Sequence, residues 1–297
     1  MNSSFNECAV VIDGNSLTYR AYYATWNQMQ YFISNNIKPN NAIKLMLIMV
    51  LKILQDFNPK YTLIAFDAGK KTFRHEVFKQ YKANRLKTPI ELINQIKELH
   101  IAITLCGYHA YMQEGIEADD IIGSFASLMN KNKVLCKIFS SDRDMLQLVN
   151  EQTEVYMPKK GVSEMQLFNY YNFEQLMDGL HPNQITDYKG IVGDSSDNIP
   201  GIKGIGKKTG IKLLQKFGSL ENIYANLNLL NEKQKKLFIN SKEIAFQCKL
   251  LSTIKKDIFD NKNLNDFQRP LIKTEKLFDF LHECKINNME KYIFSVK

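Results

Sequence analysis

The chain has 297 residues, of which 44% are hydrophobic and 24% are charged, and it contains no low-complexity segment. This composition is typical of a soluble globular protein and excludes the collagen-like and intrinsically disordered classes. The net charge is +8, from 39 Lys and Arg against 31 Asp and Glu. A basic chain suits a polyanionic partner, and this length allows two domains because single cores stop growing near roughly 250 to 300 residues.

Cysteine usage and hydropathy indicate a reducing, cytoplasmic environment. The five cysteines are widely spaced and never form a C-x-x-C pair, which argues against disulfides and against a zinc site. The longest apolar run, residues 45–51, is far shorter than the roughly 20 residues that span a bilayer. Residues 1–8 are mostly polar, so no secretory signal is expected. We therefore expect a cytoplasmic protein with no membrane partner.

Three short apolar runs are each followed closely by an aspartate. The runs and their acids are residues 9–12 with Asp13, 61–66 with Asp67, and 134–139 with Asp142. Helical patterns at 42–55 and 89–100 separate these runs, and a further helix is expected from 117 to about 130. The alternation predicts parallel strands in βαβ units, which bring all three acids to one edge of a sheet.

Nine carboxylates in the first two thirds of the chain are the candidate catalytic and metal-binding groups. They are Asp13, Asp67, Glu117, Asp119, Asp120, Asp142, Asp144, Asp194 and Asp197. Singly, each has an ordinary explanation as a turn residue, a helix cap or a partner of a helix dipole. Together at one edge they would repel each other unless hard divalent cations neutralise them. We expect a Mg²⁺ site with two ions, for which Mn²⁺ can substitute, suited to phosphodiester hydrolysis.

Residues 199–210, IPGIKGIGKKTG, combine closely spaced glycines with lysines. These are Gly201, Lys203, Gly204, Gly206, Lys207 and Lys208. Glycines permit a tight turn between helices whose backbone N–H groups approach a phosphate closely, as in a helix-hairpin-helix. A nucleotide-binding P-loop is an alternative, but a lysine replaces its Ser/Thr and no strand precedes it. A purely structural turn would leave the lysines unexplained.

Residues 72–85 interleave basic and aromatic side chains in a stretch too long for an ordinary strand-to-helix loop. Such a segment can follow a single-stranded backbone and stack on its bases. Arg20, with Tyr19 and Tyr22, lies just after the first strand and extends the same basic surface. An amphipathic surface helix is an equally weighted alternative for this segment.

Five segments resemble, in order, the 5′-nuclease domain of bacterial DNA polymerase I and its flap endonuclease relatives. They are VIDGNSL at 11–17, AFD and TFR at 65–67 and 72–74, GIEADDI at 115–121, SDRDMLQL at 141–148 and GIVGDSSDNIPG at 190–201. The resemblance implies a PIN-like parallel sheet flanked by helices, followed by a mostly helical helix-hairpin-helix domain. We place the catalytic domain at 1–180, with a basic arch at about 70–88. The helical domain takes 181–260 and a C-terminal extension takes 261–297.

The same resemblance implies roles for individual residues. Asp13, Asp67, Glu117 and Asp119 would surround a first metal ion with Asp120 beside them, and Asp142, Asp144, Asp194 and Asp197 would hold a second. Asp13, Asp67, Asp120, Lys82 and Arg85 are the catalytic candidates. The expected DNA contacts are Arg20, Arg74, Tyr81, Lys82, Arg85, Lys203, Gly204, Gly206, Lys207 and Lys208. The hairpin can also hold K⁺ in the family.

The implied activity is that of a structure-specific 5′→3′ exonuclease and 5′-flap endonuclease in replication and repair. Its partners would be DNA with 5′ ends or flaps and RNA–DNA primer junctions, and we expect a monomer. A noncatalytic structure-specific DNA-binding protein is the alternative, which the intact carboxylates oppose. A single-domain PIN-type ribonuclease is disfavoured by the length of the chain and by the helical segment after residue 181.

Overall fold

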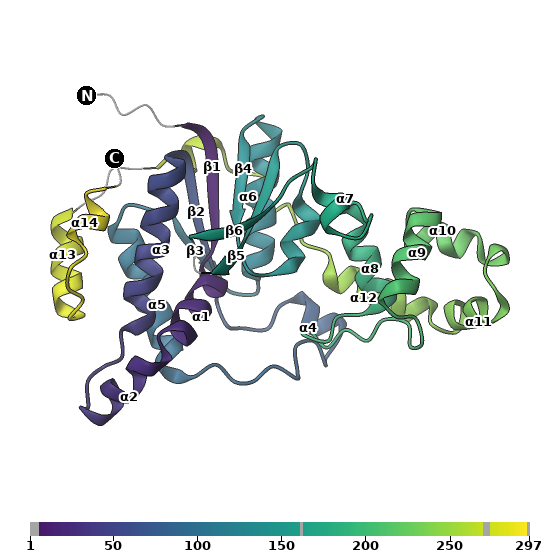
Figure 1. Cartoon of the computed structure of the whole chain (residues 1–297), viewed down its shortest axis with the longest axis horizontal. Helices are drawn as coiled ribbons and strands as arrows, with labels where there is room; N and C mark the ends of the chain where they lie inside the picture. The colour runs from purple at the N-terminus through teal and green to yellow at the C-terminus, as the bar shows by residue number, and fades with distance from the viewer. Residues whose placement is uncertain (1–5, 161–162, 270–273, 296–297) are drawn as a thin grey trace.

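A six-stranded sheet forms the centre of the computed structural model, which describes residues 6–160, 163–269 and 274–295. The strands are β1 (Asn6–Asp13), β2 (Pro59–Asp67), β3 (Ala110–Gln113), β4 (Leu135–Phe139), β5 (Thr153–Lys160) and β6 (Glu164–Phe168). Their order in the sheet is β3-β2-β1-β4-β5-β6, and only the β5–β6 pair is antiparallel. Helices cover both faces of the sheet (Figure 1).

The register of the central strands confirms that their carboxyl ends meet at one edge. Asp13 at the end of β1 pairs with Ala65 of β2, two residues before Asp67. Ile12 pairs with Phe139 of β4, and Asp142 follows three residues later. Parallel strands with this register deliver the side chains after their last residues to a common rim.

Two apolar layers hold helices against the sheet. One face carries α1 (Gly14–Ala24), α3 (Asn41–Phe57) and α5 (Ile90–Leu105), with α2 (Trp26–Ser34) beside them. The other face carries α6 (Ala118–Lys131), whose Ile121, Ile122 and Phe125 are buried as the sequence pattern predicts. Because α6 begins directly after Glu117, its packing fixes the position of the acidic residues in its first turn.

Two short helices lie between strands of the sheet, α4 (Phe73–Val77) after β2 and η1 (Arg143–Leu148) after β4. Two more, α7 (Phe173–Leu176) and η2 (Pro182–Gln184), follow β6. The later helical part contains α8 (Ile185–Val192), α9 (Lys207–Phe217), α10 (Leu220–Ala225), η3 (Leu227–Leu229), α11 (Glu232–Asn240) and α12 (Lys242–Ser252). It has its own apolar cluster and extends to one side of the sheet (Figure 1). None of the described helices has the length and hydrophobicity needed to cross a membrane.

The C-terminal segment returns to the sheet part of the molecule. After η4 (Leu264–Phe267) come α13 (Thr274–Glu283) and α14 (Glu290–Ile293). Leu277, Leu281 and Ile293 are buried in the same cluster as α3 and α5. The expected extension is therefore helical and packed where it is described, while residues 270–273 and 296–297 lie outside the described ranges.

The glycine-rich turn joins α8 to α9 and requires glycine at its closest approach. Gly201 has φ +64°, and a Cβ there would lie 2.3 Å from the backbone N of Gly193. The next residue, Ile202, donates its N–H to Ile191 of α8 at 2.7 Å. By contrast, Gly206 has φ −94° and open space around its Cβ position.

Gly201→Ala is therefore expected to lower the free energy of unfolding by about 2 kcal/mol or more, through backbone strain and steric overlap. Gly206→Ala is the matched control in the same turn and should cost less than about 1 kcal/mol. Urea denaturation followed by circular dichroism measures both values. Equal effects of the two substitutions would contradict this explanation.

Candidate active site

Two aspartates at the ends of neighbouring strands begin the site. The carboxylate of Asp13 accepts hydrogen bonds from the N–H of Ser16 at 2.8 Å and from the hydroxyl of Ser140 at 2.6 Å. The carboxylate of Asp67 accepts from the N–H of Ala118, the first residue of α6, at 2.7 Å. These bonds fix both side chains at the rim of the sheet.

A cavity of about 500 Å³ opens at this rim. Its acidic lining residues are Asp13, Asp67, Asp119 and Asp142. Within the described ranges, none of these four forms an ion pair with a basic side chain. The sheet and the first turn of α6 thus bring together acids that have no direct basic partner.

Burial raises the pKa of carboxyl groups in this cavity. Desolvation raises the pKa of Asp13 to about 7, although its hydrogen bonds act in the opposite direction. The pKa of Asp119 is raised well above its ordinary value by burial and then by the charge of Asp142. Burial also raises the pKa of Asp67. A cation bound in the cavity would stabilise the ionised forms of these carboxyl groups. Their oxygens are the ligands that hard divalent metal ions prefer, so the cavity fits such an ion.

Basic residues between α4 and α5 lie at the same cavity. The ammonium of Lys82 donates to Glu117 at 2.7 Å, and the guanidinium of Arg85 donates to Asp197 at 2.5 Å. Lys82 and Arg85 both line the cavity. Burial would raise the pKa of Glu117, but the charges of Lys82 and Arg74 outweigh it and lower that pKa.

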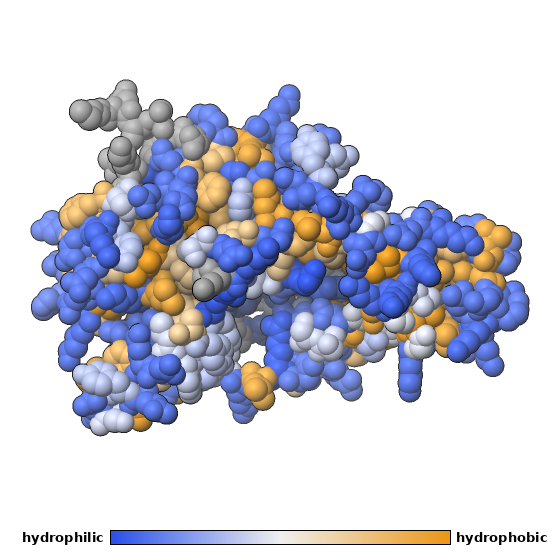
Figure 2. Space-filling view, in the orientation of Figure 1, coloured by the Kyte–Doolittle hydropathy of each residue, from blue (hydrophilic) through white to orange (hydrophobic). Residues whose placement is uncertain are grey.

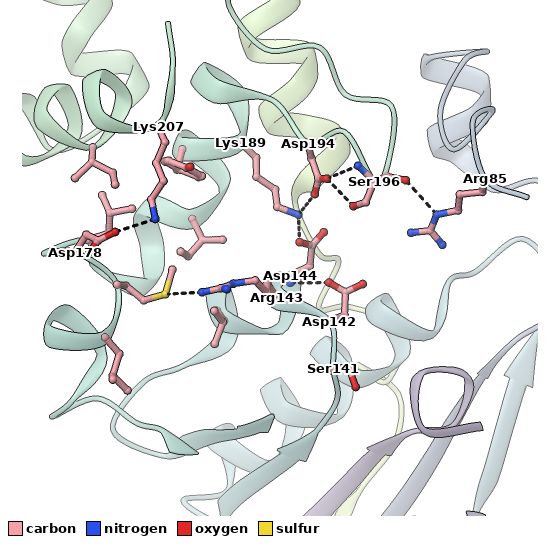
Figure 3. A pocket seen from close by; sticks show the side chains of 17 residues that line it. Arg85, Ser141, Asp142, Arg143, Asp144, Asp178, Lys189, Asp194, Ser196 and Lys207 are labelled. Carbon is pink, nitrogen blue, oxygen red and sulfur yellow. Dashed lines mark hydrogen bonds and ion pairs between the residues drawn. The ribbon is translucent and has the colours of Figure 1, made fainter. Parts of the chain in front are cut away.

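A second cavity, of about 570 Å³, adjoins the first at Asp142, which lines both. It also contains Asp144 and Asp194, and the ammonium of Lys189 lies between these two carboxylates (Figure 3). Lys189 outweighs the effect of burial and lowers the pKa of Asp194. Six of the nine predicted acids therefore line the two cavities, the second of which holds a resident lysine. The other three, Glu117, Asp120 and Asp197, line neither cavity and form ion pairs with Lys82, Arg74 and Arg85.

In the part of the chain that the structure describes, no three His, Cys, Asp or Glu side chains stand together as a ready metal-ligand set. Glu117, Asp144 and Asp194 are turned toward ammonium groups, and the four acids of the first cavity line its walls without meeting at one point. The assignment of ligands to two ions stays a prediction.

Two predicted site residues, Arg74 and Asp120, face away from both cavities. They form a two-point ion pair at 2.7 Å for each bond, and each side chain is only 2% exposed. Arg74 also donates to the carbonyls of Leu251 and Thr253, at 2.8 and 2.9 Å. This geometry does not fit the expected DNA contact or catalytic carboxylate. It instead ties α4 and α6 to the end of α12.

Of two further predicted DNA contacts, Tyr81 is buried and Arg20 lies at the first cavity. The hydroxyl of Tyr81 bonds Glu117 and Asp197 at 3.3 and 3.2 Å, and the residue is only 3% exposed. The predicted stacking of this ring on a base is therefore not possible in this conformation, because the ring is buried. Arg20 lines the first cavity and donates to the carbonyl of Lys159, so it keeps a position suited to a nucleic-acid contact.

The hairpin lysines are exposed where the turn enters α9. Lys203, Lys207 and Lys208 have exposed side chains, and Gly204 and Gly206 lie among them. Lys207 also lines the second cavity, which places the hairpin beside the acidic cleft. Hydrophilic side chains cover most of the visible face of this helical part, and hydrophobic ones are interspersed (Figure 2).

Among the residues that line the cavities, sequence reasoning missed Tyr23 of α1 in the first, and Arg143 and Lys189 in the second. Tyr23 lies four residues after Tyr19, which places both on one helix face, and Arg143 stands between two of the predicted acids. Lys189 carries no comparable signal, because only the packing of α8 against η1 brings it to Asp144.

The family models match almost the whole chain. Residues 8–178 match the 5′-3′ exonuclease, N-terminal resolvase-like domain, and residues 180–275 match the 5′-3′ exonuclease, C-terminal SAM fold. The chain belongs to the 5′-3′ exonuclease family. The predicted fold class and 5′-3′ exonuclease activity are thereby confirmed.

Curated relatives of the family include stand-alone and fused forms. A 5′-3′ exonuclease of Mycoplasma genitalium is 45% identical over 285 residues, covering 96% of this chain and 98% of the relative. DNA polymerase I of Bacillus subtilis is 39% identical over 249 residues, which cover 84% of this chain but 28% of the polymerase.

Solved structures share the fold at lower identity. The T5 D15 protein co-crystallised with metal ions has a TM-score of 0.70 at 19% identity, covering 93% of this chain and 99% of that one. The catalytic core of Rad2 in complex with DNA substrate has a TM-score of 0.63 at 16% identity, covering 98% and 91%. At these identities the likeness establishes the arrangement of elements.

The buried Arg74–Asp120 pair generates a stability prediction. Arg74→Ala should lower the free energy of unfolding by about 3 to 5 kcal/mol, because it leaves a buried carboxylate without its partner. The control is Lys131→Ala, whose pair with Asp260 has side chains 61% and 55% exposed. It should cost less than about 1 kcal/mol. Denaturant titration of both variants measures the difference, and similar values would contradict the proposed tie.

Proposed function

We propose that this chain hydrolyses DNA phosphodiesters at 5′ ends and 5′ flaps, and at RNA–DNA primer junctions, with Mg²⁺ as its cofactor. The observation that carries the proposal is the first cavity, which Lys82 and Arg85 line together with four carboxylates that have no basic partner among the described residues. Carboxylates gathered in one cavity favour the binding of divalent cations. The positive charges of Lys82 and Arg85 at the same cavity favour the binding of a phosphate. The metal-bound T5 D15 protein and the DNA-bound Rad2 core have the same fold.

Separate residues would bind the cation and orient the phosphate. Asp13, Asp67, Asp119 and Asp142 would hold the cation, and Lys82 and Arg85 would orient the phosphate that enters the cavity. When bound, divalent ions supply positive charge at the reacting phosphate and lower the pKa of the attacking water. The surface is hollowed beside α1, above the segment linking α4 to α5, which leaves room for a strand (Figure 2).

The hairpin side of the molecule would hold the duplex. Exposed lysines at 203, 207 and 208 neutralise phosphates without reading bases. Family matches that meet between residues 178 and 180 support a boundary near residue 181. Binding should therefore weaken steeply as salt rises, since each phosphate contact releases counterions.

Cleavage of a labelled 5′-flap duplex in Mg²⁺ tests the proposed function directly. We expect cutting that a chelator abolishes. Asp142→Ala and Asp194→Ala should each lose about 10²-fold or more in rate, and Lys82→Ala about 10²-fold, while DNA binding persists. Lys131→Ala, in an exposed ion pair away from the cavities, is the control and should cut normally. Binding without any metal-dependent cutting would favour the noncatalytic alternative.

The raised pKa values predict that metal binding releases protons. Because burial raises the pKa of Asp13 to about 7, this carboxyl is partly protonated at neutral pH, and burial shifts the pKa of Asp119 in the same direction. Mg²⁺ requires the ionised forms, so its affinity should rise as pH increases through about 7. Calorimetric titration at pH 7 in two buffers of different ionisation enthalpy measures the release.

Asp13→Asn should release fewer protons than the unaltered chain at pH 7, and release should diminish for both by pH 9. Equal heats in the two buffers at pH 7 would refute the assignment of protonated carboxyls to the cavity.

A further inference from the structure

Lys189 occupies the space between two predicted metal-ligating carboxylates. It lies in the last turn of α8, and its ammonium bonds both Asp144 of η1 and Asp194 of the following loop, the latter at 2.5 Å. The residue is only 9% exposed. Figure 3 shows this bridge within the second cavity. A single positive charge therefore already serves two acids contributed by separate parts of the chain.

The backbone that carries Lys189 is held by packing. The neighbouring Ile191 is fully buried, and a Cβ at Gly190 would lie 2.9 Å from the carbonyl oxygen of Ala245 in α12. Helix α8 is thus packed tightly against α12. Lys189 can leave Asp144 and Asp194 by rotating its side chain within the second cavity, which it lines together with both acids.

The contact of Lys189 with Asp144 and Asp194 makes the second cavity chemically different from the first. The first cavity presents carboxylates that form no ion pair with any described basic side chain, whereas the oxygens of Asp144 and Asp194 are directed at an ammonium. A divalent ion needs the same oxygens and is repelled by a cation a few ångströms away. An ammonium and a metal ion cannot both occupy that position.

We propose that Lys189 is a resident counter-cation that excludes a divalent ion from Asp144 and Asp194 in the DNA-free protein. The free protein then binds one divalent ion in the first cavity, and a second enters only after Lys189 has turned away. Lys189 acts as a positioning residue that sets metal occupancy. The inference rests on the proposed metal-dependent function, but it concerns the number of ions bound without substrate.

Calorimetric titration of Mn²⁺ into DNA-free, chelator-treated protein tests the proposal. The unaltered chain should bind one ion tightly. Lys189→Met should reveal a second site at least about tenfold tighter than any second site of the unaltered chain, because the competing charge is gone. Lys189→Gln, which keeps a hydrogen-bond donor, provides the same test if the methionine variant does not fold. Lys189→Arg keeps the charge and should retain one site.

Lys249→Met is a matched control. Lys249 of α12 bridges Asp187 and Glu221, at 2.6 and 2.7 Å, and lines neither cavity. Its loss should leave Mn²⁺ binding unchanged, whereas a general effect of losing a bridging lysine would alter both variants. Circular dichroism confirms that each variant is folded.

Tight binding of two Mn²⁺ ions by the unaltered chain would overturn the proposal, as would Mn²⁺ titrations of Lys189→Met and Lys189→Gln that match that of the unaltered chain. So would a second site in Lys189→Arg or Lys249→Met. The flap-cleavage assay is read separately. A second ion site gained on losing Lys189, together with no metal-dependent cutting, would support the counter-cation and reject the nuclease proposal.

Discussion

Mutual repulsion among carboxylates at the carboxyl end of a parallel sheet is the constraint on which this structure depends. The strands place Asp13 and Asp67 side by side, and α6 and the segment after β4 add Asp119 and Asp142. Each is shielded from water to some degree, so ionising all of them together is unfavourable. The surrounding elements are arranged so that this charge is either compensated by basic groups or left available to cations.

Most of the compensation comes from segments that are far apart in the sequence. The segment between α4 and α5 brings Lys82 to Glu117 and Arg85 to Asp197, while α8 brings Lys189 to Asp144 and Asp194. Lys189 and Asp194 are five residues apart, whereas the residues of each other pair are at least 35 apart. The charges that would destabilise an isolated sheet edge therefore help to hold these segments together.

The Arg74–Asp120 pair shows the same principle in a fully buried form. Arg74 uses its remaining donors on carbonyls at the end of α12, and the backbone N–H of Lys255 donates to Asp120 at 2.9 Å. This buried pair and its neighbours thus join α4, α6 and the end of α12 beside the site. Arg74 and Asp120 line neither cavity, so their effect on the site is through the position of these helices.

The sequence by itself determined the sheet edge and its acids, because apolar runs ending in Asp13 and Asp67 and a helix starting after Glu117 are local patterns. The short β3 and the β5–β6 hairpin were missed, since their apolar alternation is weak. Only the tertiary structure decided which acids have basic partners, why Arg74 is buried, and that Lys189 reaches Asp144. Those outcomes depend on burial and on the meeting of distant segments, which no local pattern of residues specifies.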